Sequence, residues 1–249
     1  MRTFIFAFIG FIFLLFHANC SSSQTIIDLT WNFNNETIYW PGQRQFQITK
    51  ATESEKRGFW YSVKEFCAAE HGGTHFDAPY HFYKEGWKVS EVPVDRLFAK
   101  GALIETNQSN LYAKDLIKWE ESNGRFDNGT VLLVKTGMGK YWTSNKTKYL
   151  ALDTQNRMNF PGLSADAALW IAQSGQFFGV GIDTPSIDPG NSTDMVAHRT
   201  LASGQLFNLE NVNLQEIHLR KGFDIIIAPM KLEEGTGAPV RIFAILKIS

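Results

Sequence analysis

The sequence is poor in cysteine and lacks the long charged runs that mark several classes of protein. Only Cys20 and Cys67 occur in 249 residues, so no network of disulfides is expected to hold the fold together. There is no run rich in lysine and arginine, and the formal net charge is −1. The basic surface of a nucleic-acid-binding protein is therefore not expected. A conspicuous apolar run, residues 4–16, is shorter than the roughly 20 residues that cross a bilayer.

That run lies in the N-terminal stretch "MRTFIFAFIGFIFLLFHANCSSS". One arginine precedes it, and the small residues Ala18 and Cys20 stand at −3 and −1 of a cut after Cys20, which is typical of a secretory signal peptide. A signal anchor and a buried helix are the alternatives. We predict a signal peptide over residues 1–20. The mature domain, residues 21–249, would then be secreted or stay in the secretory-pathway lumen, with no membrane segment.

Two further features bear on secretion. Cleavage would leave Cys67 as a lone thiol, which is either buried or pairs between chains. Its apolar-rich surroundings, "YSVKEFCAA", favour burial. Five Asn-X-Ser/Thr triplets follow the signal, where chance would give about two. The candidate glycosylation sites are Asn35, Asn107, Asn128, Asn145 and Asn191.

Short apolar segments rich in β-branched and aromatic residues predict several strands. These segments are "TIIDLTW", "VLLVKTG", "FFGVGIDT", "FDIIIAP" and "VRIFAILKI". The segment "SADAALWIAQSG" predicts a helix with Ser164 as N-cap and Gly175 at its end, while "SEVPVDRL" and "AKDLIKWEESNG" are weaker helix candidates. Since 44% of the residues are hydrophobic, the chain can bury one sizeable core. We expect a single α/β domain built on a mixed sheet.

The stretch "EHGGTHFDAPYHF", residues 70–82, holds half of the six histidines. A helix is disfavoured because two glycines and a proline interrupt it. In a strand, side chains alternate, so His71, His75 and Asp77 would point to one face. The proline after the strand would let the chain turn and bring His81 back.

Two neutral imidazoles and one carboxylate are typical ligands for Zn²⁺, Mn²⁺ or Fe²⁺. Three protein ligands leave positions open for water, which the metal acidifies enough to act as a nucleophile. His81 would then be a base or proton shuttle. The alternative is a group of ordinary histidines without a metal, but their clustering on one face favours the metal site.

The same residues resemble a known signature. "HGGTHFDAPYHF" is similar to the HxGTHxDxPxH motif of the metal-dependent cyclase family, which includes bacterial-type kynurenine formamidase and isatin hydrolase. Other segments resemble family segments over nearly the whole mature chain: "IIDLT", "WPG", "VLLVKTGMGKYW", "FPGLSADAALW", "GVGIDTPSID" and "GTGAPVRIFAI". The resemblance implies a swivelling β/β/α fold, commonly dimeric, in which the N-terminal segment can contribute to the partner's site.

The resemblance also implies roles for individual residues. The metal ligands would be His71, His75, Asp77, His198 and Glu210, holding one or two Zn or Mn ions. His81 matches the catalytic histidine of the family. Because Asn191 lies between the "GIDTPSID" block and His198, we expect it near the mouth of the site.

The implied reaction is hydrolysis of a C–N bond in a small aryl amide or lactam by metal-activated water, with His81 transferring the proton. The leading substrate is N-formyl-L-kynurenine, which would give L-kynurenine and formate; the alternative is isatin, which would open to isatinate. Aromatic residues near the motif would stack on the aryl ring or pack in the core. They are Trp40, Trp60, Tyr80, Phe82 and Trp87.

Two other classes of protein are alternatives to a metal-dependent hydrolase. A serine hydrolase would need a GxSxG elbow, and the nearest stretch, "GLSAD", lacks the second glycine. A secreted protein that binds metal or ligand on the same fold without turnover is the stronger alternative. Such a protein would be expected to lose a ligand or the catalytic histidine, and all six of these residues are present.

Overall fold

The computed structural model describes residues 24–247, so the predicted signal peptide and Cys20 lie outside the described residues. The strands are β1 (Gln24–Asp28), β2 (Gln47–Ser54), β3 (Tyr61–Cys67), β4 (His75–Asp77), β5 (Phe98–Glu105), β6 (Asn110–Leu111), β7 (Thr130–Lys135), β8 (Gly162–Leu163), β9 (Phe177–Ile182), β10 (Phe207–Glu210), β11 (Lys221–Pro229) and β12 (Gly237–Lys247). The α-helices are α1 (Ala113–Asn123), α2 (Lys146–Tyr149), α3 (Ala165–Ser174) and α4 (Val196–Ser203).

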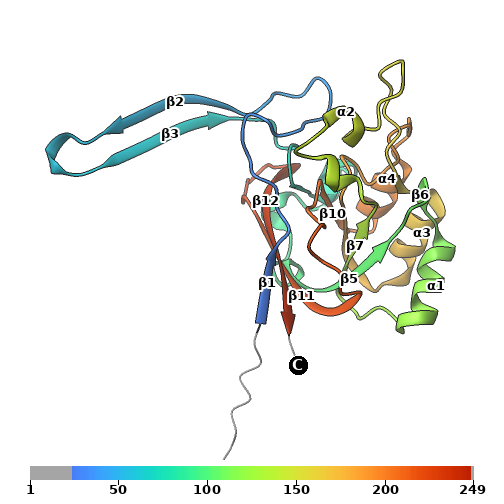
Figure 1. Cartoon of the computed structure of the whole chain (residues 1–249). Coiled ribbons are helices and arrows are strands. Elements are labelled where there is room, and N and C mark those ends of the chain that lie inside the picture. The colour runs from blue at the N-terminus through green and yellow to red at the C-terminus, as the bar shows by residue number, and fades with distance from the viewer. Residues whose placement is uncertain (1–23, 248–249) are drawn as a thin grey trace, which may run out of the picture.

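Eight strands form one mixed sheet that closes on itself (Figure 1). Its order is β1-β12-β11-β5-β7-β9-β10-β4, and β4 also pairs with β12. Strands β5, β7, β9 and β10 run parallel to one another, while the remaining pairs are antiparallel. The five strands predicted from the sequence all lie in this sheet, which confirms the expected α/β fold with a mixed sheet.

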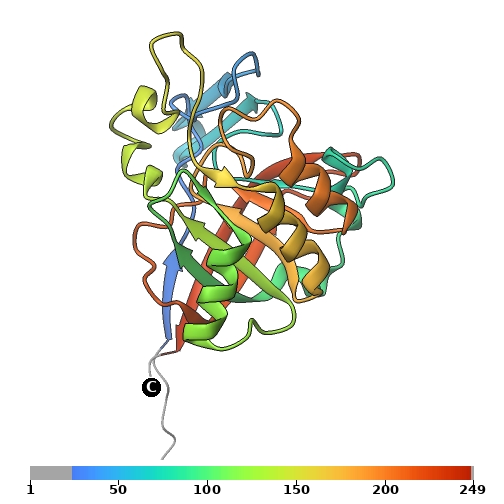
Figure 2. The ribbon, with the colours of Figure 1, turned by 90° about the vertical axis from the view of Figure 1, so that its right-hand side faces the viewer.

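Two hydrophobic layers hold the fold together. Inside the closed sheet, Phe76, Leu209 and Ile225 belong to the first core. The second core lies on the outer face of β5, β7 and β9 and joins the sheet to the helices. It contains, for example, Leu132 of β7 and Ile171 of α3. Figure 2 shows α1, α3 and α4 on this one face of the sheet. Burial of both faces explains why β7 and β9 read as continuous apolar runs.

The helix predicted after Ser164 is confirmed as α3. Ser164 Oγ accepts a hydrogen bond from the backbone N–H of Ala167, and Gly175 ends the helix with a left-handed φ of 69°. The weaker candidate "AKDLIKWEESNG" forms α1, whereas "SEVPVDRL" forms only short 3-10 turns. The proline within that segment disfavours regular helix hydrogen bonding.

A long hairpin of β2 and β3 projects away from the rest of the molecule (Figure 1). This hairpin was not predicted from the sequence, because polar residues are spread over both strands. Cross-strand ion pairs support the hairpin, with Lys50 Nζ 3.2 Å from Glu65 Oε1. Phe59 and Trp60 near its tip are 59% and 61% exposed.

The structure also shows the surroundings of Cys67 and of the five sequon asparagines. Cys67 at the end of β3 is free and half-buried rather than buried, because the hairpin strand that carries it is solvated on both faces. All five sequon asparagines are exposed. None of the helices among residues 24–247 is long and apolar enough to cross a membrane.

Candidate metal centre and active site

Strand β4 is three residues long and closes the sheet between β10 and β12. His75 pairs with Glu210 on one side, and Asp77 pairs with Gly237 on the other. Side chains alternate along a strand. Phe76 therefore enters the interior core, while the buried side chains of His75 and Asp77 lie together on the opposite face of β4. Glu210, opposite His75 in the ladder, points to the same face.

The chain before β4 departs from the expected strand. We predicted one continuous strand from His71 to Asp77, and this is wrong. Gly73 has a left-handed φ of 62°, and only an isolated bridge joins Gly72 to Tyr39. The chain therefore bends at the two glycines, and His71 approaches Asp77 from the bend rather than from the strand face.

After β4 the chain turns at once. Pro79 occupies the first position of a 3-10 turn over Pro79–His81, where its fixed φ and missing N–H are tolerated. The backbone N–H of His81 donates to the carbonyl of Ala78 at 2.9 Å. This turn brings the His81 ring back onto His71, with 4.0 Å between the ring centroids and 23° between the planes.

His198 is supplied by α4, whose start is fixed by Asp188. The carboxylate of Asp188 accepts hydrogen bonds from the backbone N–H groups of Ala197 and His198, and its Oδ2 lies 2.6 Å from His198 Nδ1. The cap therefore comes from a distant residue and not from the residue before the helix, Met195. Helix α4 therefore has no local start signal in the sequence and was not predicted.

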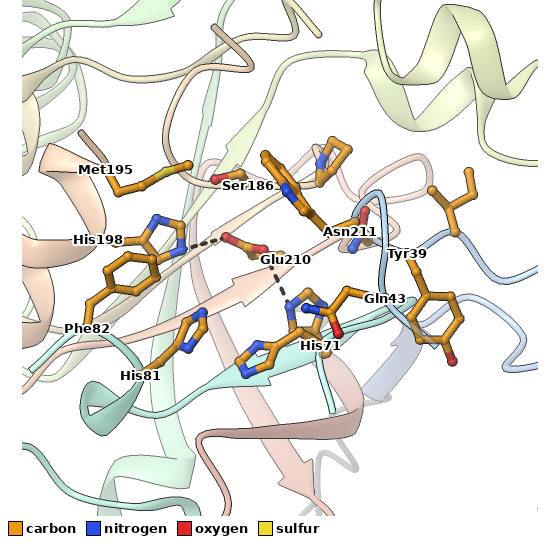
Figure 3. Close-up of a pocket in the computed structure, with 14 residues that line it drawn as sticks. Tyr39, Gln43, His71, His81, Phe82, Ser186, Met195, His198, Glu210 and Asn211 are labelled. Carbon is orange, nitrogen blue, oxygen red and sulfur yellow. Dashed lines mark ion pairs between the residues drawn. The ribbon is translucent and has the colours of Figure 1, made fainter. Parts of the chain in front are cut away.

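Asp77 lies at the centre of the cluster. Its Oδ1 is 2.7 Å from His71 Nδ1 and 3.2 Å from His75 Nε2, and its Oδ2 is 3.3 Å from His198 Nε2. Glu210 reaches His198 Nε2 at 3.0 Å and His75 Nε2 at 3.4 Å (Figure 3). The structure thus brings all five residues that the resemblance implies as ligands to one place, although residues 71 and 210 are far apart in the chain.

These groups change each other's pKa. Burial alone would lower the pKa of His75, but the charge of Asp77 and hydrogen bonds with Asp77 and Glu210 raise it to about 10. Burial would raise the pKa of Asp77, yet the charges of His75 and His71 hold it well below its usual value. For His198, burial again lowers the pKa, and hydrogen bonds to carboxylates raise it well above its usual value. These directions mean that protons on the imidazoles of His75 and His198 would balance the negative charges of the buried Asp77 and Glu210.

This donor set fits a divalent metal ion. Asp77 and Glu210 are both buried, and imidazole nitrogens are their neighbours in the cluster rather than the lysine or arginine that usually accompanies a buried carboxylate. A cation would supply the charge that the imidazole protons otherwise supply. Two overlapping groups have ligand atoms close enough to share an ion: His71, Asp77 and His81, and His75, Asp77 and Glu210. Asp77 belongs to both.

His81 is the most exposed histidine of the cluster, whereas His71 is half-buried and His75 and His198 are buried. Packing around its ring nevertheless lowers the pKa of His81 to about 4, with burial as the largest cause. The direction of this shift leaves the imidazole neutral near pH 7.

A cavity of about 220 Å³ opens over the cluster. Of the aromatic residues expected there, Trp40 and Phe82 line it, and the structure does not bring Trp60 or Tyr80 to it. Trp60 is carried away at the tip of the hairpin, and Tyr80 instead lines a neighbouring depression together with Lys84 and Arg199.

Several residues around the cavity were not singled out from the sequence. Gln43, Ser186, Met195 and Asn211 are among its lining residues. The signal for Ser186 was present in the "GVGIDTPSID" block, but nothing local separates it from its neighbours. Asn191 lies in the loop between Ser186 and Met195, and its expected position near the mouth of the site stays a prediction.

Asn211 connects the cavity wall to the cluster. Its Nδ2 donates to the carbonyl of Gly73 at 2.7 Å, and that carbonyl also lies 2.9 Å from His75 Nδ1. The buried Tyr149 hydroxyl donates to Asn211 Oδ1 at 2.7 Å. Asn211 has a left-handed φ of 53°, a conformation that asparagine tolerates better than most residues.

Comparisons with known proteins agree with this architecture. A family model described as "Putative cyclase" matches residues 27–189. A kynurenine formamidase of Bacillus cereus is 30% identical over 216 residues, covering 86% of this chain and 94% of the relative. Isatin hydrolase A from Labrenzia aggregata has the same fold, with a TM-score of 0.81 and 23% identity over 90% of this chain and 94% of that one.

A further solved structure, titled "The Structure Of Potential Metal-Dependent Hydrolase With Cyclase Activity", matches with a TM-score of 0.70 and 21% identity, over 90% of this chain and 98% of that one. The family match covers the turn, β4 and their flanking segments, and the relatives align over nearly their whole length. The chain therefore belongs to the cyclase family.

Proposed function

We propose that this protein is a metal-dependent hydrolase that cleaves the C–N bond of a small aryl amide or lactam. The observation that carries the proposal is the convergence of His71, His75, Asp77, His198 and Glu210 on one buried centre beneath a cavity that His81 also lines. The centre would hold one or two Zn or Mn ions, because nitrogen and carboxylate ligands suit both metals. The names of the relatives support an acylamide or lactam substrate.

The chain's own residues can then be assigned steps. When bound, the metal supplies an acidified water and polarises the substrate carbonyl. His81 accepts a proton from the attacking water and returns it to the leaving nitrogen. Trp40 and Phe82 offer flat apolar surfaces for an aryl ring. The Ser186 hydroxyl accepts from the N–H of Asp188, so its own proton is available to a polar atom of the substrate.

The leading reaction is hydrolysis of N-formyl-L-kynurenine to L-kynurenine and formate, which the name of the kynurenine formamidase relative supports. That substrate carries an amino-acid carboxylate, and cationic groups lie next to the cavity. Lys84 and Arg199 line a shallow depression that shares His81 and Phe82 with the cavity wall. This depression is where we place the amino-acid end of the substrate.

One observation favours a second candidate, the opening of a neutral lactam such as isatin. Among residues 24–247, no lysine or arginine lines the cavity itself. A compact uncharged substrate would fill about 220 Å³ without needing an ionic partner. The two candidates therefore differ in whether the rim cations contribute to binding.

The test is a metal and activity measurement on the mature protein, purified without chelator. We expect Zn or Mn by elemental analysis and hydrolysis of N-formylkynurenine, isatin or both, with the ratio of their kcat/KM values ranking the two candidates. Bound metal without turnover of either substrate would favour the alternative, a secreted metal- or ligand-binding protein. Absence of bound metal, together with no response to added Zn²⁺ or Mn²⁺, would overturn the proposal.

We also propose that the protein enters the secretory pathway by cleavage after Cys20 and carries N-glycans. The N-terminal pattern and the five exposed sequon asparagines support this. When the full chain is expressed in a eukaryotic secretion host, the protein should be found in the culture medium with Ser21 as its first residue. Its mass should fall on treatment with an N-glycosidase. A protein retained in the cytosol with an intact N-terminus would contradict it.

We further propose a homodimer in which the hairpin of β2 and β3 packs on a second copy. A two-stranded hairpin is marginally stable alone in water, and contiguous exposed apolar surface marks an interaction site. Phe59, Trp60, Tyr61 and Val63 are between 46% and 61% exposed. Docking on a second copy would cover them.

Mass measurement by light scattering tests this arrangement. The wild type should be a dimer, and the double variant Phe59→Ser/Trp60→Ser should be largely monomeric at micromolar concentration. Glu55→Ser, at the same exposed tip, is the matched control and should remain dimeric. A monomeric wild type, or a double variant that stays fully dimeric, would contradict the proposed role of the hairpin.

A further inference from the structure

His71 has a second hydrogen-bonding partner on the side away from Asp77. Its Nε2 lies 2.8 Å from the Thr236 hydroxyl oxygen. That hydroxyl in turn donates to Glu70 Oε2 at 2.7 Å. The same carboxylate oxygen accepts from the backbone N–H groups of Thr236, at 3.0 Å, and Gly237, at 3.3 Å. Glu70, Thr236 and His71 therefore form a continuous hydrogen-bonded chain.

The direction of this chain follows from counting protons. A threonine hydroxyl has one proton to donate, and an ionised carboxylate only accepts. Since the Thr236 proton points at Glu70, its oxygen can only accept from His71. His71 must therefore carry a proton on Nε2, and in the neutral imidazole the lone pair of Nδ1 then faces Asp77 Oδ1 at 2.7 Å.

A lone pair and a carboxylate oxygen repel each other at that distance unless positive charge lies with them. In His75 and His198, too, the ring nitrogen that points away from the cluster faces a hydrogen-bond acceptor. His75 Nδ1 lies 2.9 Å from the carbonyl of Gly73, and His198 Nδ1 lies 2.6 Å from Asp188 Oδ2. Each outer nitrogen faces an acceptor, so each inner nitrogen is left for a cation. For His71 alone, the acceptor is a hydroxyl that could equally well have been a donor.

We propose that Glu70 and Thr236 are positioning residues that fix His71 in the Nε2–H tautomer and so keep Nδ1 available to the metal. The inference rests on the proposed metal-dependent function and deepens it. Glu70 is what makes the hydroxyl of Thr236 an acceptor toward His71. Outer partners of this kind typically change metal affinity by about 10- to 100-fold.

The position of the His71 ring is fixed separately from its tautomer. One face stacks on His81, and the start of β12 lies so close that a Cβ on Gly237 would be 2.4 Å from His71 Cε1. Loss of the Thr236 hydroxyl should therefore leave the ring in place and change where its proton resides. Tautomer and affinity, rather than fold, are the quantities that should respond.

The experiment compares Thr236→Val, which removes the hydroxyl with little change of shape, with Thr236→Ser, which restores it. Thr52→Val on the exposed hairpin is the matched control. Zn²⁺ affinity of metal-free protein is measured by competition with a chelating dye. In ¹⁵N-histidine-labelled, Zn²⁺-loaded wild type, long-range NMR correlations should show His71 protonated on Nε2, with slow solvent exchange of that proton.

We expect Thr236→Val to bind Zn²⁺ about 10- to 100-fold more weakly and Thr236→Ser and Thr52→Val to bind within about threefold of wild type. Should Thr236→Val fail to fold, Glu70→Gln serves instead; its amide oxygen can take the same hydrogen bonds without the charge, so a smaller loss in the same direction is expected. Wild-type affinity in Thr236→Val, or a proton on Nδ1 of His71, would overturn the relay while leaving the metal site intact. A wild type that binds no Zn²⁺ would instead count against the proposed function.

Discussion

Replacement of Asp77 by asparagine should remove metal binding and turnover together. The amide has nearly the shape of the carboxylate but no charge, so the cluster loses the negative charge of the one group that contacts His71, His75 and His198. Partners outside the ligand set already change affinity by about 10- to 100-fold. A direct ligand that belongs to both candidate metal groups should cost at least about 100-fold.

The measurement is metal content per chain after desalting, with Zn²⁺ affinity by competition and kcat for whichever substrate the wild type accepts. Asp95→Asn, an exposed aspartate on a distant turn, is the matched control and should behave as wild type. An Asp77→Asn protein with wild-type metal content and affinity would remove Asp77 from the ligand set. Only the metal assignment would then need revision, because the fold does not depend on it.

Thermal unfolding gives an independent view of the same variant. A metal that binds the native state but not the unfolded chain raises stability in proportion to the logarithm of its concentration over Kd. Zn²⁺ should therefore raise the Tm of the wild type, and chelation should lower it again. Asp77→Asn should show neither shift, because its native state has lost the differential affinity for the metal.

The parts of this fold that the sequence predicts are those whose signal is local. Apolar runs predict strands β7, β9, β11 and β12. The cap at Ser164 and the glycine at the end predict α3. The placement of His75 and Asp77 on one face follows from alternation in β4 alone. In each case the residues that determine the structure are neighbours in the chain.

The parts that could not be predicted depend on distant residues. The start of α4 is capped by Asp188, and the polarity of His71 depends on Thr236, 165 positions away. Closure of the sheet by β4 between β10 and β12 is likewise a pairing of remote segments. Trp60 is near the motif in sequence and far from the cavity in space because a hairpin intervenes. Only the resemblance to the family linked His198 and Glu210 to the first motif.

Replacement of His81 by alanine should separate catalysis from metal binding. His81 shares a candidate metal group with His71 and Asp77, so it could in principle be a ligand instead of the residue that moves protons. Its environment argues for the second role. Solvent reaches it, it lines the cavity, and the surroundings of its ring lower its pKa, which leaves a neutral imidazole able to accept a proton near pH 7. His75 and His198 are buried instead, and each contacts both Asp77 and Glu210.

If His81 moves the proton, His81→Ala should lower kcat by about 10²- to 10⁴-fold while metal content and Zn²⁺ affinity stay near wild type. His218→Ala, which removes an exposed histidine remote from the cluster, controls for loss of an imidazole as such and should keep full activity. If metal content fell with activity in His81→Ala, the residue would be a ligand, and the group of His71, Asp77 and His81 would be a second ion site. Unchanged kcat with unchanged metal would leave the cavity without its proton carrier, and the reaction would then have to proceed with solvent as the base.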